Sequence, residues 1–568
     1  MFVRNRSFSL FAAATAAVFA TAAVGLPGAA WGAQHGLALK PPMGWNDWAH
    51  YQCGFTAQTI LANARALVRT GLAARGYDTV TIDDCWMLKD RDSHGNLQPD
   101  PRRFPHGMRP VAAAIHALSL RFGIYEDAGS ATCGRFAGSG SPRGGGEPHF
   151  AADARLFAAW GVDYLKLDGC NVHPDQGAAG SAAYRAVYRA EHIALERAGR
   201  PIVFSESAPA YFQGTADWYD VLGWVRDYGQ LWREGTDIEV YDPKQPNRPR
   251  FGSVLWNYDY NLQLGRFQKP GNWNDADFII GGDSGMTLAE SRSQLALWAM
   301  MSAPLILSSD LDRLSPAALA ILGNQAVLSV DQDPLGVMAT LERRSPSSDV
   351  LMKPLQNGDY AVAVLNRSPA AVHVHLLPGE LGFGATCRLD VHDLWNGARH
   401  ASLGALDAEI GAHDTNIWKV RPAHGCGTPA RIGVITRIVP EVPQMPEEVA
   451  HYTRCLAAPG TAEPCAGTAS ETWRIIPDGA LRSGQECLTQ TRGRAALAKC
   501  RSTDTQRWRY TLPGNLINRA SHLCLTAPTS GELAVQACGH NLASQIWALP
   551  NEMARTRATP RPNVGHSK

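Results

Sequence analysis

The 568-residue sequence lacks an excess of either charge, because 53 lysines and arginines stand against 52 aspartates and glutamates. A chain without a strongly basic or acidic balance has no field that draws it to nucleic acid or to an acidic membrane surface. We therefore expect a neutral partner. With 45% hydrophobic and 18% charged residues, the composition is that of a globular protein, and the length predicts two or three domains.

Motifs that mark common metal and cofactor sites are also absent. None of the twelve cysteines forms a Cys-x-x-Cys pair, which argues against structural zinc and against a redox centre. There is no Asp-x-Asp-x-Asp-Gly calcium loop. The glycine-rich stretch at 138–146 lacks a Gly-Lys-Ser/Thr ending and does not open a helix, which indicates a rim loop rather than a phosphate-binding one. We expect no cofactor and no metal.

The N-terminus has the layout of a secretory signal peptide. An apolar, alanine-rich run follows Arg4 and Arg6 and ends in small residues near Ala33. The run is short for a membrane-spanning helix, and no second one follows. We predict a signal peptide at residues 1–33 and a secreted or extracytoplasmic protein, with a retained membrane anchor as the alternative. Export would allow the even set of cysteines to form disulfides.

From residue 34 to 336, short β-rich segments alternate with amphipathic helical ones. Alternation of this kind predicts a parallel sheet, and about eight units fit a (β/α)8 TIM barrel of the α/β class. Strands are predicted at 79–82, 122–125, 163–167, 201–205 and 305–307, and helices at 108–115, 182–198 and 288–301.

After residue 336 the pattern changes to closely spaced strands without helices, as at 360–365 and 372–376. It predicts an antiparallel β-sandwich over residues 337–422. A proline-rich stretch with few apolar pairs then predicts a stiff linker at 423–449. The tail at 551–568 is predicted to be disordered.

Residues 450–550 contain a threefold repeat. Each copy opens with Cys-Leu, and a second cysteine precedes a tryptophan by eight or nine residues, as in Cys465 to Trp473, Cys500 to Trp508 and Cys538 to Trp547. This pattern resembles the ricin-B-like β-trefoil. We expect the tryptophans to form the core rather than sugar platforms. Ricin-type sugar sites usually place an aspartate after the Cys-x pair, where this sequence has Ala457, Thr489 and Thr526, so the resemblance implies at most a weak polysaccharide contact.

Polar residues gather at the predicted ends of the barrel strands, where catalytic groups lie in this fold. Many carboxylates around one mouth repel one another unless cations, hydroxyl donors or a metal offset them. No histidine joins the set, so sugar hydroxyls are favoured over a metal. The set comprises Trp48, Asp83, Asp84, Tyr125, Glu126, Asp127, Lys166, Asp168, Ser207, Arg233, Asp237, Asp275 and Asp277.

Two of these carboxylates suit glycoside cleavage, which needs a nucleophile or base on one side of the scissile bond and an acid on the other. Asp168 suits the first role, because Lys166 lies two residues earlier on the same strand face and favours the ionised form. Asp237 suits the second role, provided that burial and neighbouring carboxylates favour its protonated form.

Over residues 38–420 the sequence resembles glycoside hydrolase family 27, the α-galactosidase and α-N-acetylgalactosaminidase family. The resemblance rests on eight stretches, including Tyr164-Leu-Lys-Leu-Asp-Gly-Cys170 and Gly271-Asn-Trp-Asn-Asp275. The others are at 42–48, 82–86, 100–107, 123–125, 303–307 and 331–336.

The resemblance implies a retaining reaction with Asp168 as nucleophile and Asp237 as acid/base. It implies that Asp83 and Asp84 accept hydrogen bonds from the 4- and 6-hydroxyls of the sugar. Lys166 would hold the 3- and 4-hydroxyls, and Arg233 would approach the 2-substituent. The remaining residues of the predicted substrate site are Trp48, Tyr125, Cys133, Ser207, Ala210, Tyr211 and Asp277.

The resemblance further implies two disulfides, Cys53–Cys85 and Cys133–Cys170. Four more are predicted by proximity alone, namely Cys387–Cys426, Cys455–Cys465, Cys487–Cys500 and Cys524–Cys538.

One departure from the family bears on the substrate. Its α-galactosidases carry Glu-Trp beside the 2-hydroxyl, where an ungapped alignment puts Ser207 and Ala208. Ser207 and Ala210 would leave room for an acetamide, as in the N-acetylgalactosaminidase members, unless a one-residue shift brings Glu206 into that place. Isomaltose- and arabinose-releasing relatives are further alternatives, which the presence of Asp83 beside Asp84 weakens.

We predict an exo-glycosidase, an α-galactosidase or melibiase, that releases terminal α-D-galactosyl residues from an oligosaccharide or glycoconjugate. An α-N-acetylgalactosaminidase is the alternative within the family. A non-catalytic carbohydrate-binding protein is the alternative of another class.

Overall fold

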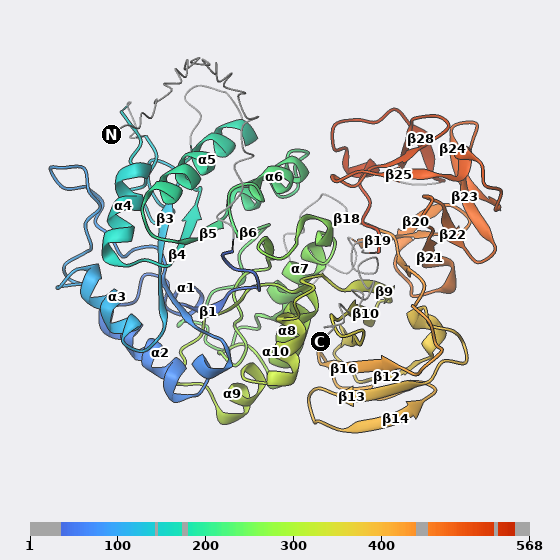
Figure 1. The fold of residues 1–568 in the computed structure, drawn as a ribbon, viewed down its shortest axis with the longest axis horizontal. Helices are drawn as coiled ribbons and strands as arrows, with labels where there is room; N and C mark the ends of the chain where they lie inside the picture. The colour runs from blue at the N-terminus through green and yellow to red at the C-terminus, as the bar shows by residue number, and fades with distance from the viewer. Residues whose placement is uncertain (1–35, 142–145, 173–179, 439–452, 528–531, 551–568) are drawn as a thin grey trace, which may run out of the picture.

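The structure is a computed structural model that describes residues 36–141, 146–172, 180–438, 453–527 and 532–550. The predicted signal peptide and the predicted disordered tail lie outside the described residues, as do residues 439–449 of the predicted linker. Among the described residues, no helix combines the length and apolarity that a membrane span requires. Three units follow one another along the chain, with the barrel at the left of Figure 1, the trefoil at its upper right and the β-sandwich below the trefoil.

The predicted (β/α)8 barrel is confirmed. All strand pairings in its eight-stranded sheet are parallel, in the order β7-β6-β5-β4-β3-β2-β1-β8, and a parallel bridge between Ile279 and Leu307 links the two edges. The strands are β1 (Met43–Asn46), β2 (Thr79–Ile82), β3 (Arg121–Asp127), β4 (Tyr164–Asp168), β5 (Val203–Glu206), β6 (Leu231–Arg233), β7 (Trp273–Asp275) and β8 (Leu305–Leu307).

Helices surround the barrel (Figure 1). The helix α8 is buried along most of its length because it lies between the barrel and the β-sandwich, and it begins with a capping box in which Thr287 and Glu290 bond each other's backbone N–H groups. The helices are α1 (Trp48–Tyr51), α2 (Ala57–Arg69), α3 (Met108–His116), α4 (Phe150–Trp160), α5 (Ser181–Arg197), α6 (Trp218–Val225), α7 (Phe251–Asn261), α8 (Leu288–Met301), α9 (Pro316–Leu322) and α10 (Gln325–Asp331).

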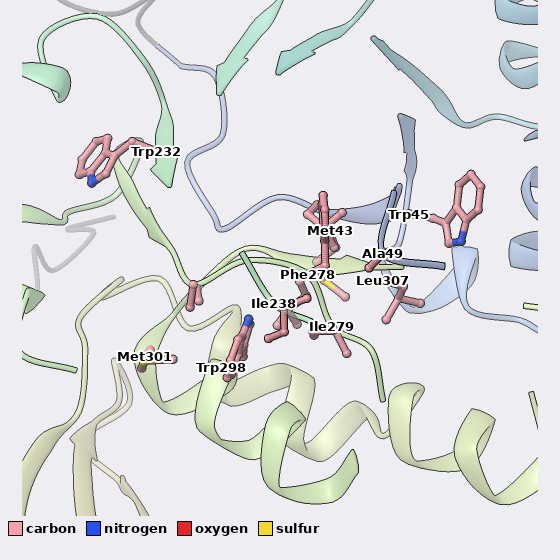
Figure 2. Packing of buried hydrophobic residues seen from close by; sticks show 14 of the residues in the cluster. Met43, Trp45, Ala49, Trp232, Ile238, Phe278, Ile279, Trp298, Met301 and Leu307 are labelled. Carbon is pink, nitrogen blue, oxygen red and sulfur yellow. The ribbon is translucent and has the colours of Figure 1, made fainter. Parts of the chain in front are cut away.

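The hydrophobic core reaches up to the strand ends that carry polar groups. Figure 2 shows Phe278, Ile279 and Leu307 in the same buried cluster as Trp298 of α8. The indole Nε1 of Trp298 donates to the carbonyl oxygen of Asp277 at 2.9 Å. A large buried side chain therefore holds the backbone of a predicted site residue in place.

The predicted antiparallel β-sandwich is also confirmed. Its main sheet has the strand order β14-β13-β16-β11-β10-β9, and β12 pairs with β15 in a two-stranded sheet. The strands are β9 (Thr340–Arg344), β10 (Ser348–Pro354), β11 (Tyr360–Asn366), β12 (Val372–Leu376), β13 (Leu389–Asp393), β14 (Arg399–Leu403), β15 (Leu406–Ile410) and β16 (Thr415–Pro422).

A buried ionic network joins all three units. Arg344 and Arg367 of the sandwich each form ion pairs with Asp349 and with Asp259 of α7. The same Arg344 donates from Nη1 to the hydroxyl of Thr453 in the trefoil, at 3.1 Å. Because each buried charge here has several partners, the network fixes how the units meet without leaving a charge unpaired.

The C-terminal unit forms a nine-stranded sheet, β17-β21-β22-β23-β24-β28-β27-β26-β25, and a three-stranded one, β18-β19-β20. Its strands are β17 (Ile432–Val434), β18 (Thr436–Ile438), β19 (Thr453–Ala457), β20 (Thr461–Pro464), β21 (Thr472–Ile475), β22 (Leu481–Ser483), β23 (Glu486–Thr491), β24 (Arg494–Lys499), β25 (Trp508–Tyr510), β26 (Leu516–Asn518), β27 (Cys524–Thr526) and β28 (Ala534–Gln536). The strands β17 and β18 lie inside the range 423–449 predicted as a linker, and they pair with β21 and β19.

The threefold repeat is visible in the hydrogen bonds of the core. The buried indoles of Trp473, Trp508 and Trp547 donate to the carbonyl oxygens of the leucines in the three Cys-Leu pairs, Leu456, Leu488 and Leu525. The tryptophans are therefore core residues, as predicted. All six predicted disulfides are present as well.

Candidate active site

The parallel sheet brings the predicted site residues together because the carboxyl ends of its strands meet at one mouth. In the register of β3 and β4, Tyr125 lies beside Lys166 and Asp127 beside Asp168. Side chains alternate along a strand, so these pairs share the inner face of the barrel.

A buried ion pair forms one side of the mouth. The Nζ of Lys166 donates to Oδ2 of Asp83 at 2.7 Å, and Nδ2 of Asn46 donates to the same oxygen at 2.7 Å. Nζ also lies 5.1 Å from the ring centre of Tyr125 and 5.2 Å from that of Phe278. Burial alone lowers the pKa of Lys166, but the charges of Asp83 and Asp168 outweigh it, so the net shift is upward and the ammonium stays charged.

Backbone N–H groups hold the other two carboxylates of this side. Asp84 accepts from the N–H groups of Cys85 and Gly134, at 2.6 and 2.7 Å. Asp127 accepts from Gly129 and from Cys170, at 2.7 and 2.9 Å. Burial nevertheless raises the pKa of Asp84, and burial together with the charge of Asp168 raises the pKa of Asp127 to about 8.

Asp168, at the end of β4, is held through one oxygen. Its Oδ1 accepts from the hydroxyl of Tyr211 at 2.5 Å and from the N–H of Gly169 at 3.2 Å. The ammonium of Lys166 is hydrogen-bonded to Asp83 and interacts with Asp168 through its charge. Tyr211 is therefore the side chain that donates a hydrogen bond to Asp168.

Arg233 connects two carboxylates on the opposite side. It is buried at the end of β6, with Nη2 3.0 Å from Oδ1 of Asp237 and Nη1 2.9 Å from Oδ1 of Asp277. The side chain of Asp237 is 72% exposed, so the burial on which its acid role was made conditional is absent in the free protein. The reason is local, because Asp237 lies in the loop after β6, beyond the packed strand ends.

Asp277 has an unusual backbone, with a φ of +76°, a region that a residue with a side chain rarely adopts. Its N–H donates to Asp275 at 2.9 Å, and its Oδ2 accepts from the N–H of Ile238 at 2.6 Å. Burial raises the pKa of Asp277 to about 7, against the opposing charge of Arg233.

Ser207 follows β5 and is buried on the inner side. The side chain of the preceding Glu206 lies against Gly229, at the amino-terminal side of β6. A Cβ added to Gly229 would be only 2.3 Å from Oε1 of Glu206. Burial raises the pKa of Glu206. The structure thus does not bring Glu206 to the side of the mouth on which Ser207 lies.

The remaining predicted residues lie around the same mouth. Trp48 is half-buried at the start of α1, directly after β1, and Ala210 and Tyr211 lie on the short 3-10 helix η2 (Ala208–Phe212). The hydroxyl of Tyr125 lies 3.3 Å from Sγ of Cys133. Asn46 and Phe278 contact Lys166 or its partner but were not predicted, although Phe278 directly follows Asp277 and Asn46 lies two residues before Trp48.

These buried carboxyls predict a pH-dependent stability. Asp127 and Asp277 have folded-state pKa values of about 8 and about 7, above their usual value of 3.8. A carboxyl whose pKa is raised by folding stabilises the folded state fully at a pH below its unfolded-state pKa. This stabilisation is lost as the pH rises through the folded-state pKa. The melting temperature should therefore fall between pH 5 and pH 8.5, by several degrees, as measured by calorimetry. Asp127→Asn should flatten the decrease, and a melting temperature that rises over this range would contradict the assignment.

A (β/α)8 barrel whose mouth carries paired carboxylates at the ends of β4 and β6 is the architecture of a barrel glycoside hydrolase. Residues 40–333 match the family model described as "Alpha galactosidase A", residues 345–420 the "Alpha galactosidase C-terminal beta sandwich domain", and residues 449–547 the "Ricin-type beta-trefoil lectin domain". The chain belongs to the α-galactosidase A family of glycoside hydrolases.

Individual relatives agree with this assignment. The sequence is 36% identical to "Alpha-galactosidase A" from Aspergillus niger over 531 residues, which covers 91% of this chain and 93% of that protein. It is 34% identical to an α-galactosidase from Oryza sativa, over 68% of this chain and 86% of that one. Among solved structures, α-galactosidase I from Mortierella vinacea superposes with a TM-score of 0.60 at 28% identity, covering 68% of this chain and 98% of that one.

Proposed function

We propose that this protein is a retaining exo-glycosidase that hydrolyses terminal α-D-galactosyl residues of oligosaccharides or glycoconjugates. The observation that carries the proposal is the pairing of Asp168, bonded through one oxygen to Tyr211, with Asp237, bonded to Arg233, across the same barrel mouth. Family membership and the names of the relatives support the α-galactosyl substrate.

In the first half of the proposed reaction, Asp168 attacks the anomeric carbon and forms a galactosyl ester of inverted, β configuration. Tyr211 and Gly169 bond Oδ1, so we assign the attack to Oδ2. Asp237 donates its proton to the leaving oxygen as the glycosidic bond breaks. The covering of Asp237 by a bound sugar would supply the shielding from water that the free protein lacks.

In the second half, the carboxylate of Asp237 takes a proton from a water molecule, which attacks the same carbon. The ester bond to Asp168 breaks, and galactose leaves with its original α configuration. Arg233 is buried and keeps its charge throughout, so it can stabilise Asp237 in the ionised form that this step requires.

The Asp83–Lys166 pair and Asp84 are proposed to recognise galactose. The carboxylate oxygens of Asp83 and Asp84 can each accept further hydrogen bonds, and Lys166 can donate to the same hydroxyls. Acceptors placed for an axial 4-hydroxyl are left unpaired by the equatorial hydroxyl of glucose, and that loss is how such a site discriminates.

A second candidate substrate is the α-N-acetylgalactosaminide, which the small Ser207 favours. Its hydroxymethyl side chain leaves space beside the expected 2-substituent, and Glu206, which could have filled that space, points toward Gly229. The test is to assay p-nitrophenyl α-galactoside beside p-nitrophenyl α-N-acetylgalactosaminide, with Asp168→Ala as the inactive control. Cleavage of neither substrate by the wild type would refute the proposed function.

Ser207→Glu distinguishes the two substrates. The larger, charged side chain should exclude an acetamide and bond a 2-hydroxyl, so we expect kcat/KM for the acetamido substrate to fall by about 10-fold or more, against less than about threefold for the galactoside. The ratio of the two kcat/KM values is the measurement. An unchanged ratio would show that Ser207 does not border the 2-substituent.

We propose a structural role for the trefoil, with at most a weak polysaccharide contact. The hydroxyls of Thr489 and Thr526, at positions where sugar-binding trefoils usually have aspartate, accept hydrogen bonds from Gln506 and Gln545 within their own repeats. Secretion is proposed from the six disulfides, which form in oxidising compartments.

A further inference from the structure

The loop that carries Asp237 is held by a side chain from another strand end. The amide oxygen Oε1 of Gln213 accepts from the N–H of Thr236 at 2.9 Å and from its hydroxyl at 3.2 Å. The same hydroxyl accepts from Nε1 of Trp256, on α7, at 2.6 Å. These contacts hold both the backbone and the side chain of Thr236, which directly precedes Asp237.

The approach of Gln213 depends on a glycine. A Cβ on Gly235 would lie 2.4 Å from Oε1 of Gln213 and 2.5 Å from its Cδ, so a residue with a side chain there would displace the amide. Arg233, at the end of β6, holds the backbone of the same loop, since Nη2 donates to the carbonyl oxygens of Gly235 and Thr236 at 3.2 and 3.1 Å. Gln213 is thus the contact that holds the loop from the side of β5.

Gln213 also lies next to the residues that hold the other carboxylate. It directly follows η2, in which Tyr211 donates to Asp168. The short segment from Tyr211 to Gln213 therefore contacts Asp168 with one side chain and the Asp237 loop with another. The separation of the two carboxylates decides the course of glycoside cleavage, so a link between their supports bears directly on catalysis.

The trefoil braces this segment from outside. Nδ2 of Asn541 donates to the carbonyl oxygen of Ala216 and to Oδ1 of Asp220, both at 3.0 Å. Ala216 lies three residues after Gln213, at the start of the turn into α6. The segment is therefore anchored at both ends, which gives the Gln213 side chain a rigid base.

The geometry points to Gln213 as a positioning residue that keeps the acid/base carboxylate of Asp237 aimed at the leaving oxygen. The inference rests on the proposed function of Asp237. Loss of the acceptor at Gln213 removes the partner of the Thr236 N–H, while Trp256 and Arg233 still hold the hydroxyl and the carbonyl oxygen. The loop is then loosened on the side of β5, which weakens protonation of the leaving group. A displacement of about 1 Å of a catalytic group is enough to cost a large rate factor.

The test compares two substrates that differ in their need for acid. p-Nitrophenyl α-galactoside has a good leaving group and needs little protonation, whereas a disaccharide with galactose α-1,6-linked to glucose needs a proton at the leaving oxygen. Gln213→Met keeps the size of the side chain and removes the acceptor. Its kcat/KM should fall by about 10-fold or more for the disaccharide and by less than about threefold for the aryl substrate.

Gln213→Glu restores an oxygen acceptor and should bring kcat/KM for the disaccharide back to within about threefold of the wild type. Gln245→Met, an exposed glutamine in the loop before α7, is the matched control and should leave both values unchanged. Calorimetry checks that the variants are folded.

Wild-type turnover of both substrates tests the proposed function separately. With that activity present, an equal loss of kcat/KM on both substrates in Gln213→Met, or no loss, would overturn the positioning role. A Gln213→Glu variant that behaves like Gln213→Met would overturn it as well, because the acceptor would then be irrelevant.

Discussion

Asp168→Ala should lower kcat for p-nitrophenyl α-galactoside by about 10⁴-fold or more, since the proposed mechanism has no other nucleophile for the first step. The variant keeps the fold, because Asp168 is at a strand end and its partners are the hydroxyl of Tyr211 and a backbone N–H. The measurement is the initial rate of nitrophenolate release, with melting temperature as the control for folding.

Adding azide to Asp168→Ala tests whether the missing group is the nucleophile. A small anion can enter the space left by the carboxylate and attack the anomeric carbon from the same side, so Asp168→Ala with azide should yield β-galactosyl azide and regain rate. Product configuration is read by NMR. Full activity without azide, or an α-configured azide product, would contradict the role of Asp168.

Asp237→Ala should have the second largest effect, and it should depend on the leaving group. Without the acid, kcat/KM for an α-galactosyl disaccharide should fall by about 10²- to 10⁴-fold, while the aryl galactoside, which needs little protonation, should lose far less. Kinetics on the two substrates measure the difference.

Azide should act on a later step in this variant. It attacks the galactosyl ester in place of the water that Asp237 would have deprotonated, so the product should be α-galactosyl azide. The opposite product configurations of the two variants therefore separate the nucleophile from the acid/base. An equal loss on both substrates in Asp237→Ala would indicate that Asp237 does not protonate the leaving oxygen.

Sequence patterns were sufficient for several elements of the barrel. The strands predicted at 79–82 and 305–307 and the helix predicted at 288–301 agree with β2, β8 and α8 as observed. The runs of β-branched and apolar residues in β2 and β8 are local signals, so no distant contact was needed to find these two strands. The same holds for the threefold Cys-Leu and tryptophan repeat, in which each copy repeats the same core contact.

Strands that depend on distant partners were missed. The stretch Ile432-Gly-Val-Ile-Thr-Arg-Ile438, which contains β17 and β18, was assigned to a linker although it is rich in β-branched residues. Its two strands pair with β21 and β19. Each of these strands has only three residues, and the proline-rich stretch that follows them favoured the linker assignment.

The sequence by itself determined the barrel and the identity of the residues at its mouth, because parallel strands place all their carboxyl ends on one face. Only the tertiary structure decided how those residues are paired. It bonded Lys166 to Asp83, gave Asp168 the hydroxyl of Tyr211, and left Asp237 exposed beside Arg233. Tyr211 and Asp237 lie in the segments after β5 and β6, and the position of such a segment depends on everything packed around it.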